Sequence, residues 1–132
     1  MAATLIYEIT KMFTFSASHQ LSGLHPGHPC SRCHGHNYRV TASIASPRLD
    51  ETGMVLDYAN LKTFGAWIDD HLDHQHLNDV LDGLNPTAEH LAEYLAGVLI
   101  DTVAVPSDAT VAVTVSETDK TTATCRIDQG QP

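Results

Sequence analysis

The sequence has little positive charge and no long apolar run. Its 132 residues include seven Lys and Arg against 16 Asp and Glu, so the formal net charge is -9 at pH 7 with neutral histidines. This balance argues against nucleic-acid binding, which depends on clustered positive charge. No stretch approaches the ~20 apolar residues of a membrane span, and residues 1–15 lack the basic start and apolar run of a signal peptide. We expect a cytoplasmic protein that binds neither nucleic acid nor membrane.

Cysteine is also scarce, and the chain contains only three of these residues. An odd count without an export signal favours free thiols, metal ligands or a catalytic thiol over a disulfide framework. Residues 30–34 read CSRCH, which matches the short pattern of c-type haem attachment, although that modification usually requires export. A closed structural zinc site made of Cys30, Cys33 and two histidines is another alternative, and it leaves His19 without a role.

The residue patterns predict one domain over residues 1–132 with the order ββααββ. Apolar and polar residues alternate over 5–19, 34–44, 111–115 and 121–128, as in strands with one buried face. Apolar residues recur every three or four positions over 57–72 and 85–99, as in helices that pack on a sheet. We therefore expect an α+β fold: an antiparallel four-stranded sheet with both helices on one face. The uncovered face and edges favour a homo-oligomer.

Three histidines continue the apolar faces of the first two strands. His19 follows the odd-numbered apolar residues of the first strand, and His34 and His36 precede Tyr38 in steps of two. One histidine on an apolar face is usually a hydrogen-bonded core residue. Three in phase at neighbouring strand ends favour convergence on one ion. Catalytic zinc commonly takes three protein ligands and keeps a fourth position open, so we predict a catalytic Zn²⁺ site.

Candidate catalytic thiols lie in the loop between the first two strands. Its 14 residues, 20–33, are rich in Gly, Pro, His and Cys, and long irregular loops in compact domains are often functional. A thiol near zinc or an imidazolium becomes a thiolate more readily. Either Cys30 or Cys33 could then act as a base, and an inert buried thiol is an equal alternative for Cys33.

Two further features carry weaker signals. Asp73 stands beside His74 just after the first helix, and a carboxylate can orient an imidazole that shuttles protons. Glu117 continues the apolar face of the strand over 111–115. A carboxylate there either binds the donor edge of a ligand or lies at a solvated strand end.

Several short motifs spread over nearly the whole chain carry a family resemblance: residues 15–19, Cys30, and residues 34–36, 53–57, 72–74, 77–78, 85–87 and 117–118. Together they resemble the 6-pyruvoyl-tetrahydropterin synthase and 6-carboxy-tetrahydropterin synthase group. The resemblance implies the tunnelling fold (T-fold), whose subunits assemble into an oligomeric barrel, usually a hexamer of two stacked trimers. It also implies these roles: Zn²⁺ ligands His19, His34 and His36, proton-abstracting base Cys30, relay pair Asp73 and His74, and substrate-binding residues Glu117, for the pterin's guanidine-like edge, and Thr87.

The gap of three residues between Cys30 and His34 resembles the carboxy-forming members, which act in 7-deazaguanine and queuosine biosynthesis. The resemblance then implies a lyase that converts 7,8-dihydroneopterin triphosphate to 6-carboxy-5,6,7,8-tetrahydropterin, acetaldehyde and triphosphate. The alternative is the pyruvoyl-forming reaction, in which triphosphate is eliminated. The chain departs from the family pattern at Cys33, an additional thiol, and at Gln75, where relatives often have a basic or imidazole side chain.

Overall fold

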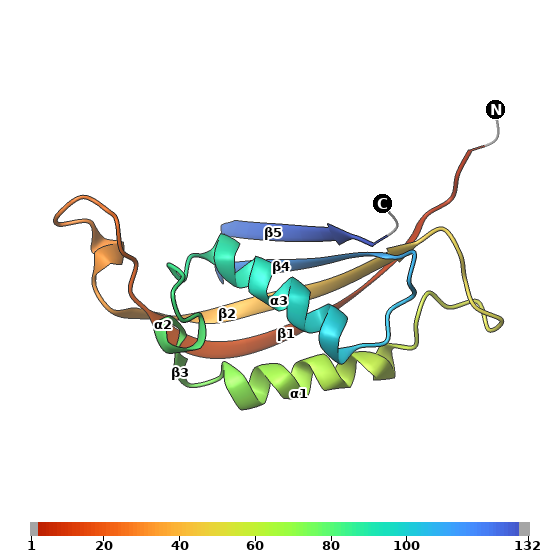
Figure 1. Cartoon of the computed structure of the whole chain (residues 1–132), viewed down its shortest axis with the longest axis horizontal. Helices are drawn as coiled ribbons and strands as arrows, with labels where there is room; N and C mark the ends of the chain where they lie inside the picture. The colour runs from red at the N-terminus through yellow and green to blue at the C-terminus, as the bar shows by residue number, and fades with distance from the viewer. Residues whose placement is uncertain (1–2, 130–132) are drawn as a thin grey trace.

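Four long strands form the antiparallel sheet that the alternating patterns predict. The computed structural model describes residues 3–129, and its long strands are β1 (Tyr7–His19), β2 (His34–Ser46), β4 (Thr110–Thr118) and β5 (Thr121–Asp128). They lie in the order β1-β2-β4-β5, and each neighbouring pair is antiparallel. The first and second strands are the longest and form the middle of Figure 1 with β4.

A short fifth strand extends this sheet beyond β1. Strand β3 (Gln75–His76) pairs in parallel with Ala17 and Ser18, and the one-turn helix α2 (Leu77–Val80) follows it directly. Two residues are too few to show a period of two, so the sequence pattern did not predict this strand. Its pairing is important for the site, because it brings the segment after α1 beside the end of β1 (Figure 1).

The two predicted helices form and cover one face of the sheet (Figure 1). Helix α1 (Lys62–His71) follows the 3₁₀ turn η2 (Tyr58–Leu61), whose start is capped by Asp57 Oδ1 accepting from the amide of Ala59 at 2.9 Å. Helix α3 (Ala88–Thr102) is capped by Thr87, whose Oγ1 accepts from the amide of His90 at 3.1 Å. At 15 residues α3 is the longest helix, and within residues 3–129 no helix has the length and apolar character to cross a membrane.

The core lies between these helices and the sheet face that carries the in-phase apolar residues. The strand register sets Phe15 opposite Tyr38, and Val40 opposite Val115. Helix residues complete this core, and those that are fully buried include Phe64, Ile68, Leu91, Leu95 and Leu99. The other sheet face carries hydroxyl groups, such as those of Thr114 and Thr124, which lie 2.7 Å apart. This is the two-sided pattern expected of an antiparallel sheet with helices on one face.

The amino-terminal part of β1 departs from the expected burial. The alternation predicts Leu5 and Tyr7 on the buried face of a strand, but β1 begins only at Tyr7, and the two residues are 64% and 39% exposed. The helices do not reach this part of the sheet, so burial along β1 is complete only from Phe15 onwards. Exposed Ile6, Met54 and Tyr58 line the same shallow pocket as Tyr7. A contiguous apolar surface of this kind fits the predicted homo-oligomer, which stays a prediction.

Candidate metal centre

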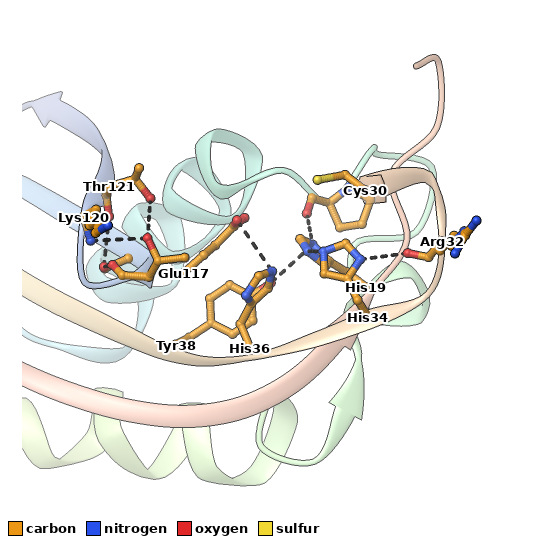
Figure 2. Close-up of polar contacts among 12 residues, drawn as sticks. His19, Cys30, Arg32, His34, His36, Tyr38, Glu117, Lys120 and Thr121 are labelled. Carbon is orange, nitrogen blue, oxygen red and sulfur yellow. Dashed lines mark hydrogen bonds and ion pairs between the residues drawn. The ribbon is translucent and has the colours of Figure 1, made fainter. Parts of the chain in front are cut away.

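The β1–β2 register brings the three predicted histidines together. His19 is the last residue of β1 and lies opposite His34, the first residue of β2, while His36 lies opposite Ala17. All three rings point to the face that also carries Tyr38, and the ring centroids are 4.5 to 5.1 Å apart. Figure 2 shows them grouped below the loop that carries Cys30.

Hydrogen bonds to backbone carbonyls orient two of these rings. Nδ1 of His19 lies 2.8 Å from the carbonyl oxygen of Pro86, and Nδ1 of His34 lies 2.7 Å from that of Arg32. A carbonyl oxygen only accepts, so both Nδ1 atoms carry the proton and both Nε2 atoms present a lone pair. These Nε2 atoms face each other at 3.0 Å. Two nitrogens on one tetrahedral zinc at about 2.05 Å would be about 3.3 Å apart, so a bound cation fits this pair.

His36 contributes a third nitrogen without a partner. Its Nε2 is a buried polar atom with no hydrogen bond, and the nearest carboxylate oxygen, Glu117 Oε2, is 3.7 Å away, too far for one. Burial lowers the pKa of His36, Glu117 partly offsets this, and the neighbouring His19 and His34 lower it further. The neutral imidazole is the form that binds metals. The ligand atoms of the three histidines lie within 4.8 Å of one another, so they can hold a metal ion.

Tyr38 packs against the three histidines, a position that the sequence analysis did not predict. Its side chain is fully buried and stacks on Phe15 with ring centroids 4.9 Å apart. Its hydroxyl lies 3.2 Å from Nδ1 of His19. Burial raises the pKa of Tyr38, and the Glu117 carboxylate raises it further, so the hydroxyl keeps its proton. Its spacing of two residues from His36 is the sequence signal from which this position could have been predicted.

A β-bulge in β4 accompanies the placement of Glu117. The β4–β5 register shifts between Val115 and Thr118, because β4 has one more residue there than β5. The Ser116 hydroxyl donates to the carbonyl of Thr121 at 2.9 Å and also contacts the carbonyl of Thr118. Bulges redirect side chains near functional sites. The Glu117 carboxylate points toward His36 (Figure 2), as its phase with Val115 predicts.

Cys30, Thr87 and Glu117 line one cleft of about 440 Å³, together with His28 and Leu24. Cys30 lies in the 3₁₀ turn η1 (Pro29–Ser31) and is half-buried, whereas Cys33 is exposed. The structure therefore brings together three of the residues predicted to bind or transform a substrate. Through Glu117, this cleft also approaches the histidine trio.

Neither cysteine joins the histidine group. Within residues 3–129, the group of His, Cys, Asp or Glu atoms that lie close enough together to hold an ion consists of His19, His34 and His36. The geometry therefore disfavours the closed structural zinc site. It also disfavours the haem alternative, because His34 is engaged with the carbonyl of Arg32 and faces His19.

Asp73 and His74 form the predicted pair, but His74 lines a different cleft from Cys30. Asp73 accepts from the amide of Ser16 at 2.9 Å, and its other oxygen lies 2.9 Å from Nδ1 of His74. His74 has a φ of 61°, a strained value for a residue other than glycine, and its amide donates to the carbonyl of Ser16 at 2.6 Å. His74 lines a pocket of about 560 Å³ with Ser18 and His76, and this pocket shares no lining residue with the Cys30 cleft of the described chain.

The chain also matches known proteins. A family model described as 6-pyruvoyl tetrahydropterin synthase matches residues 8–128. The chain belongs to this family. The 6-carboxy-5,6,7,8-tetrahydropterin synthase of Synechocystis sp. is 42% identical over 92 residues, which cover 66% of this chain and 70% of the relative. The protein of that name from Aquifex aeolicus is 29% identical over 100 residues, covering 66% of this chain and 62% of the relative.

Solved structures show the same fold. A structure of Caenorhabditis elegans 6-pyruvoyl tetrahydropterin synthase superposes with a TM-score of 0.80 at 27% identity and covers 97% of this chain and 100% of that chain. A Plasmodium vivax 6-pyruvoyl tetrahydropterin synthase reaches 0.76 at 19% identity, covering 94% and 99%. The family resemblance and the α+β T-fold are thus confirmed, and the chain falls among enzymes rather than haem carriers.

The bonds to Asp73 predict a pH-dependent contribution to stability. The amide of Ser16 and the His74 side chain hold the pKa of Asp73 below its ordinary value of 3.8. A depressed pKa stabilises the folded state above the unfolded pKa, and this effect is lost as the pH falls through the folded pKa. We expect the unfolding free energy of the parent chain to exceed that of Asp73→Asn at about pH 5, and this difference to shrink as the pH falls further.

Urea unfolding of both proteins from pH 3 to 7, with a chelator present to keep the histidines metal-free, measures this difference. Asp70→Asn, at an exposed position of α1, is the control and should show a smaller change. A difference for Asp73→Asn that does not vary with pH would contradict the assignment.

Proposed function

We propose that this protein is a zinc-dependent lyase that converts 7,8-dihydroneopterin triphosphate to 6-carboxy-5,6,7,8-tetrahydropterin, acetaldehyde and triphosphate. The observation that carries the proposal is the histidine trio, with two facing Nε2 lone pairs and a third buried nitrogen without a partner. Beside it lies a cleft with a thiol, a hydroxyl and a carboxylate. The names of the Synechocystis and Aquifex relatives favour this reaction.

Zinc is the proposed metal because three imidazoles with an open fourth position are typical of catalytic zinc sites. Bound zinc would supply Lewis-acid polarisation of the oxygens on the substrate's side chain. The chain itself holds the ligands ready: the carbonyls of Pro86 and Arg32 keep two Nε2 atoms deprotonated and directed inward. Burial lowers the pKa of His36, and the neighbouring His19 and His34 lower it further, which favours the neutral imidazole.

Glu117 and Thr87 are the proposed substrate-binding residues. A carboxylate accepts two parallel hydrogen bonds from a guanidine-like edge, which is the edge that a pterin presents. Glu117 lies half-buried in the cleft beside the trio, so it would set the pterin's distance from the metal. The Thr87 hydroxyl accepts from the His90 amide and retains its own proton to donate to a ligand in the same cleft.

Cys30 is the proposed base that removes a proton from the substrate's side chain, and Asp73 with His74 forms the proposed relay. Asp73 binds Nδ1 of His74 and so leaves Nε2 to exchange a proton. His74 lines a different cleft from Cys30 in the same chain. We infer that a second copy supplies Asp73 and His74 to the Cys30 cleft, in a homo-oligomer that the family resemblance predicts to be a hexamer.

The pyruvoyl-forming reaction is the second candidate. The Caenorhabditis elegans 6-pyruvoyl tetrahydropterin synthase, which superposes with a TM-score of 0.80, supports this alternative by its name. The two reactions start from the same substrate and need the same zinc ligands, so the fold does not distinguish them. The products do.

Zinc content gives the first test. We expect about one zinc per chain, and with free zinc at 100 times its Kd the unfolding free energy should rise by about 2.7 kcal/mol. His34→Ala should lose both effects, because it removes one of the two facing lone pairs. His25→Ala, at an exposed loop position, is the matched control and should keep them. Elemental analysis and urea unfolding measure the two effects, and retention of a different metal would contradict the choice of zinc.

Turnover is the second test. Incubation with 7,8-dihydroneopterin triphosphate followed by mass spectrometry should detect acetaldehyde and the carboxypterin, whereas a pyruvoylpterin would select the alternative. Cys30→Ala should lower kcat by about 10² or more, the usual contribution of a general base, while zinc stays bound. Cys33→Ala should stay close to the parent rate, because this thiol is exposed outside the cleft. The opposite result would exchange the roles of the two cysteines.

A mixing experiment tests the shared site. Cys30→Ala and His74→Ala chains should each be inactive alone. When the two variants are co-expressed in equal amounts, each of the two residues is intact in half of the chains. Random assembly then leaves roughly a quarter of the sites with an intact Cys30 from one copy and an intact His74 from another. We expect that fraction of parental activity in the isolated mixed oligomers. An inactive mixture would show that both residues must belong to one chain.

A further inference from the structure

Two asparagines hold the chain where it leaves the metal centre. Directly after His19, the amide of Gln20 donates to Asn78 Oδ1 at 2.9 Å, and Asn78 Nδ2 donates to the Gln20 carbonyl at 2.8 Å. Asn85 repeats this arrangement two residues later. The amide of Ser22 donates to its Oδ1 at 2.9 Å, and its Nδ2 donates to the Ser22 carbonyl at 3.0 Å.

These two side chains act like an adjacent strand. In an extended chain, the N–H and C=O of alternate residues point to the same side, and those between point to the other. Gln20 and Ser22 point to the asparagine amides. The amide of Leu21, between them, points away and donates to the carbonyl of Cys30 at 3.0 Å. The orientation of residues 20–22 therefore determines where the Cys30 backbone lies.

The rest of the loop reinforces this link. The Cys30 amide donates to Nδ1 of His28 at 3.0 Å, so both backbone groups of Cys30 are held. The Gln20 side chain donates to the carbonyl of Ser31 at 2.9 Å. No bond of this set involves the sulfur, which stays available in the cleft.

Both asparagines come from well-anchored segments. Asn78 follows Leu77, which is fully buried. Asn85 precedes Pro86, whose carbonyl binds the metal-site histidine His19, and its own carbonyl accepts from Nδ1 of His90 at 2.6 Å. One rigid segment, residues 85–87, thus holds the loop, orients a metal ligand and caps α3.

We propose that Asn78 and Asn85 are positioning residues for Cys30: their side-chain amides replace a neighbouring strand along residues 20–22 and so hold the thiol at the edge of the cleft. This gives a role to Asn78 and Asn85, which belong to the motifs at residues 77–78 and 85–87 and have none in the proposed reaction. The importance of Cys30 rests on the proposed function, but its position does not.

Alkylation of the zinc-loaded protein by iodoacetamide tests the position without any substrate. Arg32 lies between Cys30 and Cys33, so tryptic cleavage places the two thiols on separate peptides, and a third peptide carries Cys125. In Asn78→Ala and Asn85→Ala, the rate at Cys30 should rise about tenfold, because two hydrogen bonds are lost from the segment that holds it. Rates at Cys33 and Cys125 should stay at the parental value.

The variant Asn85→Asp refines the test. A carboxylate still accepts from the Ser22 amide but cannot donate to the Ser22 carbonyl, so its effect should be intermediate. Asn60→Ala, at an exposed position of η2 far from the loop in sequence, is the matched control and should match the parent. In steady-state assays, the two alanine variants should lower kcat more than they raise KM, with zinc content unchanged.

Three results would overturn the proposal: unchanged alkylation at Cys30 in both alanine variants, an equal rise at all three cysteines, or loss of zinc together with activity. An equal rise would mean that the asparagines stabilise the fold as a whole. If the parent protein shows no turnover, the proposed function fails, yet the alkylation rates still decide whether the asparagines position Cys30.

Discussion

The cross-strand pair of His19 and His34 is the constraint on which the site depends. Antiparallel pairing of β1 and β2 sets these residues opposite each other, and hydrogen bonds to two backbone carbonyls direct both Nε2 lone pairs inward. Two lone pairs at 3.0 Å repel each other unless a cation lies between them. The sheet therefore holds a geometry that a metal ion relieves, and His36 adds a third neutral nitrogen on the same face.

This constraint also explains why the loop over residues 20–33 can carry the candidate base. The loop leaves the sheet at His19 and returns at His34, so both of its ends are fixed by the strand pairing. Within it, the bonds from Asn78, Asn85 and His28 restrict a segment that the composition alone would leave irregular. The thiol of Cys30 thus has a defined place in a loop without regular structure apart from one 3₁₀ turn.

The chain divides its candidate groups between two clefts. Cys30, Thr87 and Glu117 line one of them, and His74 lines the other. Strand β3 causes this division, because its pairing with Ala17 and Ser18 places His74 on the outer side of β1. A single chain therefore contains both halves of the proposed proton transfer, in separate clefts.

Local patterns in the sequence were enough for much of the fold and for the grouping of the three histidines. A period of two identifies the strands and their buried faces, so His19, His34, His36 and Glu117 could be placed on one face from phase alone. The recurring apolar residues over 57–72 and 85–99 likewise predicted the helices α1 and α3. They failed where burial depends on what lies across the sheet, as at Leu5, which the helices do not reach.

The sequence by itself determined which residues lie in phase, because side-chain direction along a strand follows from backbone geometry alone. Only the tertiary structure decided which groups those residues contact. The carbonyl of Pro86 reaches His19 from 67 positions away, and Asn85 reaches Ser22 from 63. No local pattern records such contacts, since a backbone carbonyl is the same in every residue and its direction depends on how distant segments pack. The sequence therefore shows which residue types form the site. The tautomers of the histidines, the hydrogen bonds that orient them and the division of the residues between two clefts depend on the fold.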